Sequence, residues 1–244
     1  MAAKPIQPLV LDNVGVYGLN RQSSSSTLPP QWLTTADNMM LDERGRLTTR
    51  AGIKQISNNI GHAEVTANPP VNIKIVKSLG EYYSASGNAT IFAGAGTGIY
   101  KLDTATTPYT LALQTITGGT SKTNGNWQWQ NFNNKFYGAQ RANKPVTYDG
   151  TNWLDIEDVV GYSAPTGVTT FTPSTILGDF GRLWAADIGE NRDVVYYSDL
   201  LIGHSFASPA TPGGPGGGSL DLKKVWSGDT ITALASFMGK LIIF

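Results

Sequence analysis

The chain contains the stretch Phe132-Asn-Asn-Lys135-Phe-Tyr137, and the same order of residue types recurs twice further along. An aromatic residue, one or two small residues, a basic residue and an apolar run also follow one another in Phe180-Gly-Arg182-Leu-Trp184 and in Phe237-Met-Gly-Lys240-Leu-Ile242. A weaker copy begins at Ser86-Gly-Asn88. Short strands separated by such turns, repeated at about 40–50 residues, are typical of β-propeller blades.

A second marker recurs with the first. Apolar runs end in Asp103, Asp149 and Asp199, each following one copy of the first pattern. Asp149 is followed by Gly150 between two predicted strands, which is a strong hairpin signal. The two markers together predict an all-β, propeller-like domain with blades at about 71–115, 125–160, 174–227 and 229–244.

The last predicted blade is incomplete. A propeller has at least about four blades, and the sequence predicts three blades and half of a fourth. We therefore expect the remaining strands to come from a longer native chain or from a partner, because an open end exposes unpaired strand edges. A β-sandwich whose final strand ends the chain is the alternative architecture.

Residues 1–60 lack the repeat and are predicted to form an extended N-terminal arm, with the propeller-like domain spanning 61–244. Within the arm, residues 32–40 are the best helical candidate, and residues 46–50 alternate as a strand. Pro209–Gly218 is a Gly- and Pro-rich insertion, which we expect to be a mobile loop before a strand at 223–226.

Composition favours strands and turns and excludes several kinds of chemistry. Charged residues make up 15% of the chain, with 28 Gly and 13 Pro, against about 25% charge in an average soluble protein. The 18 acidic and 18 basic residues cancel, so the net charge provides no general attraction to nucleic acid or anionic membrane. The chain has no Cys, which excludes disulfides, thiol catalysis and Cys-based metal sites. The sequence contains neither an N-terminal secretory signal nor an apolar run long enough for a membrane span.

No motif predicts an enzyme or a cofactor. His62 and His204 fall in predicted loops without partners at metal-ligand spacing, and we expect both to be exposed. Gly94-Ala-Gly-Thr-Gly98 has the glycines of a phosphate-binding loop, but it lies between two strands and is predicted to be a hairpin turn.

Two alternatives keep a binding or catalytic role open. Trp127, Trp129 and Trp153 could stack on sugars of a host receptor, although Trp in alternating strands is more often core. Acidic residues group at three places and could cleave glycosides, although solvated turns explain them better. These groups are Asp42/Glu43, Asp155/Glu157/Asp158 and Asp187/Glu190.

The segment from Ala36 to Gly52 carries a family resemblance. It combines an Ala-x-Asn stretch, an Asp-x-x-Gly turn and a Leu-x-x-Arg-x-Gly strand. This pattern resembles the tail nozzle or tail-tube proteins of short-tailed bacteriophages, and the related proteins that stabilise packaged DNA at the portal exit. The residues that carry the pattern, and that are candidates for assembly contacts, are Ala36, Asn38, Asp42, Gly45, Leu47, Arg50 and Gly52.

The resemblance implies a non-enzymatic virion subunit without a cofactor, assembled in the bacterial cytoplasm. It implies a homo-oligomeric ring, usually of six copies, that carries a propeller-like domain, contacts the tail adaptor, the portal vertex or other tail proteins, and forms a channel for genome ejection. Double-stranded DNA would pass through without sequence-specific binding, which suits a neutral chain because each Lys or Arg contact to phosphate adds salt-dependent affinity. Arg50 is a candidate for an ion pair between subunits, or an exposed strand-end residue.

Overall fold

A computed structural model describes two compact units, Met1–Gln55 and Ile56–Phe244. The described residues are 17, 19–20, 22, 27–29, 31–33, 39–41, 47–49, 75–105, 109–119, 122–123, 125–141, 143–189, 191–223, 225 and 229–244. Strands account for the regular structure in both units, and no α-helix occurs within these ranges. The predicted all-β class is therefore confirmed.

The first unit contains one antiparallel pair of strands. β1 (Met39–Leu41) pairs with β2 (Leu47–Thr49), with Leu41 opposite Leu47. The strand predicted at 46–50 is present over Leu47–Thr49, but the helix predicted over 32–40 is wrong at Met39 and Met40. A helix of one or two turns is marginal on its own, and β2 supplies these two residues with a hydrogen-bonding partner strand instead.

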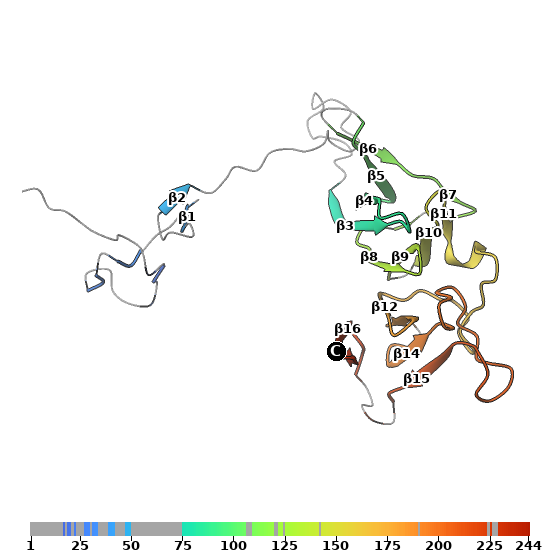
Figure 1. Cartoon of the computed structure of the whole chain (residues 1–244). Coiled ribbons are helices and arrows are strands. Elements are labelled where there is room, and N and C mark those ends of the chain that lie inside the picture. Colours follow the sequence, from blue (N-terminus) through green and yellow to red (C-terminus); the bar gives the residue numbers. More distant parts are fainter. Residues whose placement is uncertain are drawn as a thin grey trace, which may run out of the picture. The chain divides into compact units, whose positions relative to one another are not determined.

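Four sheets, antiparallel except for one short parallel pair, follow one another along the second unit (Figure 1). The first contains β3 (Val76–Tyr83), β4 (Ala89–Ala95), β5 (Gly98–Asp103) and β6 (Thr110–Leu113). The second contains β8 (Gln128–Phe132), β9 (Lys135–Gln140), β10 (Asn143–Tyr148) and β11 (Trp153–Asp155), with β7 (Ile116–Thr117) parallel to β11 and a 3-10 turn η1 (Ile156–Asp158) after it. The third contains β12 (Thr175–Asp179), β13 (Arg182–Ala186), β14 (Val194–Tyr197) and β15 (Gly218–Asp221). The last is the hairpin of β16 (Leu234–Phe237) and β17 (Lys240–Ile243).

The recurring sequence pattern forms the same turn in three sheets. Two central residues with positive φ connect the first strand to the second, and the basic residue opens the second strand. These positions are Asn133/Asn134 before Lys135, Phe180/Gly181 before Arg182, and Met238/Gly239 before Lys240. Positive φ at both central residues is the geometry of a type I′ turn, whose twist matches that of the flanking strands.

The recurring Asp also has one structural role. Asp103, Asp149 and Asp199 stand at or just after the end of the third strand of each four-stranded meander. In each case a side-chain oxygen accepts a backbone N–H one to three residues further on, at 2.7–2.9 Å. Such bonds satisfy turn N–H groups that no strand can pair.

Most of the core lies between successive sheets, and a small buried cluster of Ala93, Ala95 and Tyr100 lies on the other face of the first sheet. One buried cluster joins the first and second sheets and includes Tyr82, Phe92, Phe136 and Trp153. A second joins the second and third sheets, and a third joins the third sheet to the β16–β17 hairpin. The first strands of successive sheets also touch, β3 with β8, β8 with β12 and β12 with β16. The second unit is therefore a series of sheets packed face to face, and not the two layers of a sandwich.

The Gly- and Pro-rich insertion is mostly exposed, but its C-terminal end packs against the rest of the third sheet region. The N–H of Gly217 donates to the Ala207 carbonyl at 2.8 Å, and Arg182 Nη1 donates to the Gly216 carbonyl at 2.9 Å. A Cβ at Gly217 would lie 2.5 Å from the Phe206 carbonyl oxygen, so the glycines permit a close backbone approach that side chains would prevent. The fourth strand of this sheet is β15 at Gly218–Asp221, and the strand predicted at 223–226 is wrong at Lys223 and Val225, which lie in turns.

Candidate functional site

The signature segment includes the β1–β2 pair. Leu47 opens β2, and the Asp-x-x-Gly sequence falls between the paired residues Leu41 and Leu47. Ala36, Asn38, Asp42, Gly45, Arg50 and Gly52 lie outside the described residues.

The three tryptophans proposed for sugar stacking lie in the core between the first two sheets. Trp153 is 1% exposed and Trp127 is also buried, while Trp129 is half-buried and stacks on Phe136 with ring centroids 5.2 Å apart. Trp129 Nε1–H donates to Ser78 Oγ at 3.2 Å, and Ser78 Oγ donates to the Gly125 carbonyl at 2.7 Å. This placement makes the rings the packing surface between two sheets and leaves Trp127 and Trp153 without an open face for a sugar.

Two members of one acidic group, Asp155 and Glu157, form ion pairs around the second sheet. Asp155 Oδ1 lies 2.5 Å from Lys122 Nζ, and both side chains are buried. Glu157 pairs with Lys144 nearer the surface, and the Glu157 carboxylate raises the pKa of the Lys144 ammonium. Removal of either Lys122 or Asp155 would leave the other as an unpaired buried charge, so the two side chains stabilise the fold only together. Asp42, Glu43 and Glu190 lie outside the described residues.

Asp187 is the centre of a polar contact between the second and third sheets. Its carboxylate is buried and accepts hydrogen bonds from Arg141, from Arg192 Nε at 2.7 Å and from Ser174 Oγ. Arg141 lies in the turn between β9 and β10, whereas Ser174 and Arg192 flank strands of the third sheet. With its two guanidinium partners and the Ser174 hydroxyl, the Asp187 carboxylate links the second and third sheets. Sequence reasoning missed Arg141, Arg192 and Ser174, because only the packing of two sheets brings them together.

His204 is half-buried, whereas the sequence analysis predicted an exposed loop residue. Burial lowers the pKa of its imidazole, as does the positive charge of Lys135, and a hydrogen bond with the Val160 backbone opposes these effects. Nδ1 is buried without a hydrogen-bond partner. The side chain is therefore favoured as the neutral imidazole in the folded protein. His62 lies outside the described residues.

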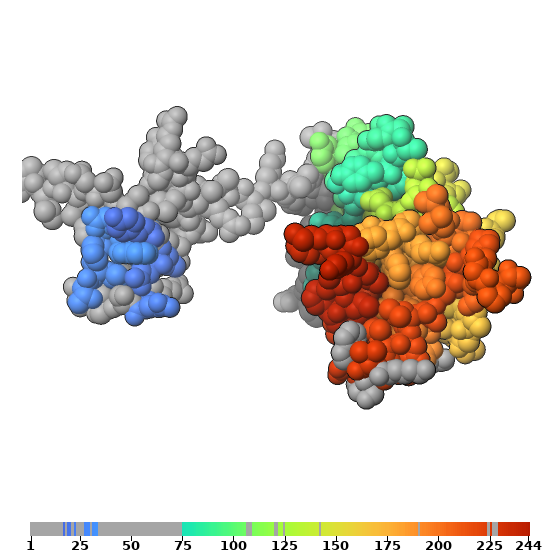
Figure 2. All heavy atoms as spheres, turned by 60° about the horizontal axis from the view of Figure 1, so that its bottom comes forward, coloured from blue at the N-terminus to red at the C-terminus, as the bar shows by residue number. Residues whose placement is uncertain are grey.

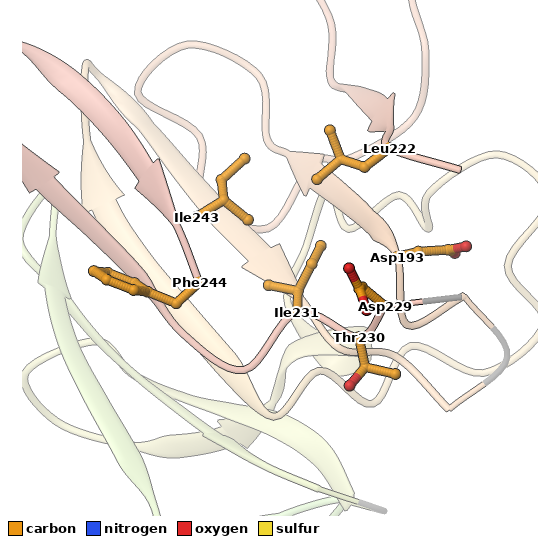
Figure 3. A pocket seen from close by; sticks show the side chains of 7 residues that line it. All are labelled: Asp193, Leu222, Asp229, Thr230, Ile231, Ile243 and Phe244. Atoms are coloured by element: carbon orange, nitrogen blue, oxygen red, sulfur yellow. The ribbon is translucent and has the colours of Figure 1, made fainter. Parts of the chain in front are cut away.

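A small pocket of about 180 Å³ lies between the third sheet and the last hairpin. Figure 3 shows the carboxylates of Asp193 and Asp229 on one side of it and the side chains of Leu222, Ile231 and Ile243 on the other. Asp193 is also within 3.7 Å of Lys223 Nζ. The pocket is too small and too open on the surface to enclose a drug-sized ligand.

The two ends of the series of sheets carry exposed apolar side chains. The face of the first sheet that points away from the second, here called the first-sheet outer face, exposes Leu79, Tyr83, Ile91 and Leu113 around the buried cluster of Ala93, Ala95 and Tyr100. At the other end, the hairpin packs Leu234 and Ile243 on the third sheet. Figure 2 shows the C-terminal segment, in dark red, against orange parts of the chain. The opposite surface of the hairpin, here called the hairpin outer face, consists of Ala235, Phe237, Lys240 and Ile242.

Both outer faces are candidate assembly surfaces. Leu79 is 69% exposed and Phe237 is 63% exposed, although residues at equivalent places on internal faces are covered by the next sheet. Groups of exposed apolar residues on neighbouring strands mark interaction sites more often than single ones do. The outer faces are therefore the best-defined sites for a protein partner in the described part of the second unit.

Comparison of the chain with protein-family models, with curated proteins and with solved structures gave no match. Among the described residues, no group of three or more His, Cys, Asp or Glu side chains is placed to hold a metal ion. The same residues include no helix with the length and apolar character needed to cross a membrane.

Proposed function

We propose that this chain is a structural subunit of a bacteriophage tail, in which copies form a homo-oligomeric ring around the channel for viral DNA. The observation that carries the proposal is the series of matching sheets, taken together with the tail-protein signature at residues 36–52. The sheets support a subunit built for packing against neighbours, and the signature supports the kind of assembly.

The series of sheets supports a propeller-like arrangement as part of this proposal. The second and third sheets and the last hairpin begin with a type I′ turn, and in the three four-stranded meanders an Asp stands at or just after the end of the third strand. The first strand of each sheet lies next to the first strand of the following one. In a propeller the first strands surround the axis while the later strands extend outward, and neighbouring blades pack through apolar faces. The contacts between first strands and the apolar packing between neighbouring sheets support such an arrangement for the second unit.

The signature segment supports the proposal from an independent part of the chain. An Asp-x-x-Gly turn followed by a Leu-x-x-Arg-x-Gly strand implies two strands joined by a tight connection. The antiparallel β1–β2 pair, with Leu41 opposite Leu47, has that connectivity. The first unit therefore supports the proposal through a strand pair that lies within the segment resembling the tail proteins.

Electrostatics also suits passage of DNA. The chain is neutral overall, and the first strands of the four sheets carry one basic residue, Lys77, beside Glu81 and Asp179. Binding to duplex DNA strengthens with each phosphate that Lys or Arg neutralises. A surface with few cations therefore allows the duplex to slide.

Electron microscopy of the purified full chain, alone and with adaptor and portal proteins of short-tailed phages, tests the proposal. We expect closed rings with a central opening, alone or on the portal assembly. A protein that stays a monomer under both conditions would contradict the tail function. A salt-sensitive, tight complex with duplex DNA would contradict the role of a channel that DNA crosses freely.

A further inference from the structure

The first unit contains a cavity of about 470 Å³ that belongs to none of the sites described above. Its described lining residues are Leu19, Asn20, Gln22 and Trp32. The volume falls within the range of about 300–1,000 Å³ that is usual for small-molecule sites. The cavity is therefore large enough to hold a ligand of a few rings or less.

Backbone hydrogen bonds hold together the two segments that form this cavity. The N–H of Tyr17 donates to the Gln31 carbonyl at 3.0 Å, and the N–H of Asn20 donates to the Leu33 carbonyl at 2.9 Å. Leu19 and Leu33 also form a parallel bridge between the same two segments. Because paired backbone sets the distance between the segments, the cavity has the preformed character that ligand sites usually have.

Trp32 supplies an aromatic surface to the cavity. Its side chain is half-buried, and its ring contacts the ring of Tyr17 with the centroids 5.5 Å apart and an interplanar angle of 51°. Tyr17 is 63% exposed, so this ring pair reaches the surface, whereas the tryptophans considered in the sequence analysis lie between packed sheets. An indole that lines a cavity is suited to stack on a flat apolar face of a ligand.

Two of the four described lining residues are amides. Asn20 Oδ1 accepts a hydrogen bond from the Gln22 N–H at 3.0 Å, which places both residues in one turn, and Gln22 is exposed. A side-chain amide carries an acceptor oxygen and two N–H donors. It therefore matches a hydroxyl group, which also donates and accepts. None of the four residues is charged.

An aromatic ring beside two amides is suited to a carbohydrate. A pyranose has a face of C–H groups that stacks on an indole and a rim of hydroxyls that need hydrogen-bond partners. Proline-rich peptides and drug-like molecules are held mainly by apolar and aromatic side chains, whereas half of this lining consists of amides. We propose that the cavity binds one sugar unit of a carbohydrate, with its ring stacked on Trp32 and its hydroxyls hydrogen-bonded to the Gln22 amide. This binding activity goes beyond the tail function, which requires no ligand.

Saturation-transfer difference NMR of the full chain tests the proposal, with glucose, galactose, mannose, rhamnose and N-acetylglucosamine as the probes. We expect at least one of these sugars to receive saturation from the protein, most strongly at the C–H protons of one ring face. Trp32→Ala should raise the dissociation constant of that sugar at least about tenfold, because the stacking surface is lost. Gln22→Ala should raise it about three- to tenfold through the loss of a hydrogen bond.

Tyr83→Ala is the matched control, because Tyr83 is a 53% exposed aromatic residue on the first sheet and does not line the cavity. It should bind the sugar as the wild type does. Gln22 is exposed, so Gln22→Ala decides the question even where Trp32→Ala disturbs the packing of Tyr17. Failure of all the probe sugars to bind the wild type, or binding unchanged in both cavity variants, would overturn the proposal. Trp32-dependent binding of a proline-rich peptide in place of the sugars would overturn it as well.

The outcome is separable from that of the tail function. Rings formed by Trp32→Ala without sugar binding would assign Trp32 to the ligand and keep the tail function. A chain that binds a sugar through Trp32 but stays a monomer with portal and adaptor proteins would support the cavity proposal and contradict the tail function.

Discussion

Replacement of Gly80 by Ala tests the packing of the first sheet on the second, on which the series of sheets depends. A Cβ at Gly80 would lie 2.6 Å from Phe136 Cζ and 2.6 Å from Trp129 Cγ, whereas ordinary contacts begin at 3.4 Å. The two rings stack on each other at an interplanar angle of 12°, and Phe136 is 1% exposed. Neither ring can therefore turn aside alone, and the strand or the ring pair must shift by roughly 1 Å.

Over-packing of this kind costs about 1–3 kcal/mol. Loss of glycine entropy in the unfolded chain returns about 0.4–1 kcal/mol, so we expect Gly80→Ala to lower the free energy of unfolding by about 1–2 kcal/mol. Equilibrium urea unfolding followed by far-UV circular dichroism measures this as a lower midpoint at an unchanged slope.

Gly189→Ala provides the control, because a Cβ there meets no heavy atom within 4 Å and Gly189 has no positive φ. It should leave the urea midpoint unchanged or raise it slightly, since only the unfolded-state effect remains. If Gly80→Ala were as stable as Gly189→Ala, β3 could not lie against Phe136 and Trp129. The packing of the first two sheets described above would then be wrong.

Three further substitutions probe the other boundaries. Asp187→Asn keeps a residue that tolerates the positive φ of 57° at this position but removes the charge from its hydrogen bonds, and urea unfolding should show a loss of about 1–3 kcal/mol. Because the pKa of His204 is lowered in the folded protein, the unfolded chain binds more protons than the folded one as pH falls below the ordinary value of 6.5. The free energy of unfolding should therefore fall with acidification in this range. The difference between the urea midpoints at about pH 7.5 and about pH 5 should be smaller in His204→Gln than in the wild type. The Ser236 hydroxyl lowers the pKa of Asp179, so Ser236→Ala should raise that pKa toward 3.8, measured by NMR titration of the carboxyl carbon; an unchanged titration would show that β16 does not lie beside β12.

The turns were the most predictable part of the fold, because their chemistry is local. Asn133-Asn134 and Met238-Gly239 adopt positive φ, which few residue types tolerate, and the basic residue that follows opens a strand each time. Gly94–Gly98 likewise forms the β4–β5 hairpin turn that was predicted, with Gly96 at a φ of 56°. Sequence alone could find these positions because three or four neighbouring residues determine them.

The remaining elements depend on residues that are distant in the sequence. β7 is two residues long and exists through its parallel pairing with β11, so its own sequence provides too little periodicity to predict it. β15 follows directly from a glycine-rich stretch whose composition suggested a loop. The Met39–Leu41 segment became a strand because β2 was available to pair with it. In each case tertiary pairing overrode local preference.

Prediction of the candidate site was limited for the same reason. The tryptophans were noticed as aromatic residues in alternating strands, and that pattern does not distinguish the face that meets another sheet from the face that meets solvent. Asp187 was noticed as one of a pair of acids, but Arg141 and Arg192 give it its environment. A residue's role at a sheet boundary is decided by the partner sheet, which a single sequence does not specify.

The basic residue of the repeat shows how position in the series changes the role of one residue type. Arg182 donates to the Ser198 carbonyl at 2.5 Å and lies over the Tyr197 ring, 5.1 Å from its centroid, inside a covered part of the third sheet. Lys135 lies close enough to His204, in the connection between β14 and β15, to lower the pKa of the His204 imidazole. Lys240 occupies the same place after the same turn, yet it is exposed on the last hairpin. Because the local structure is the same at all three positions, the difference lies in what packs next to each sheet.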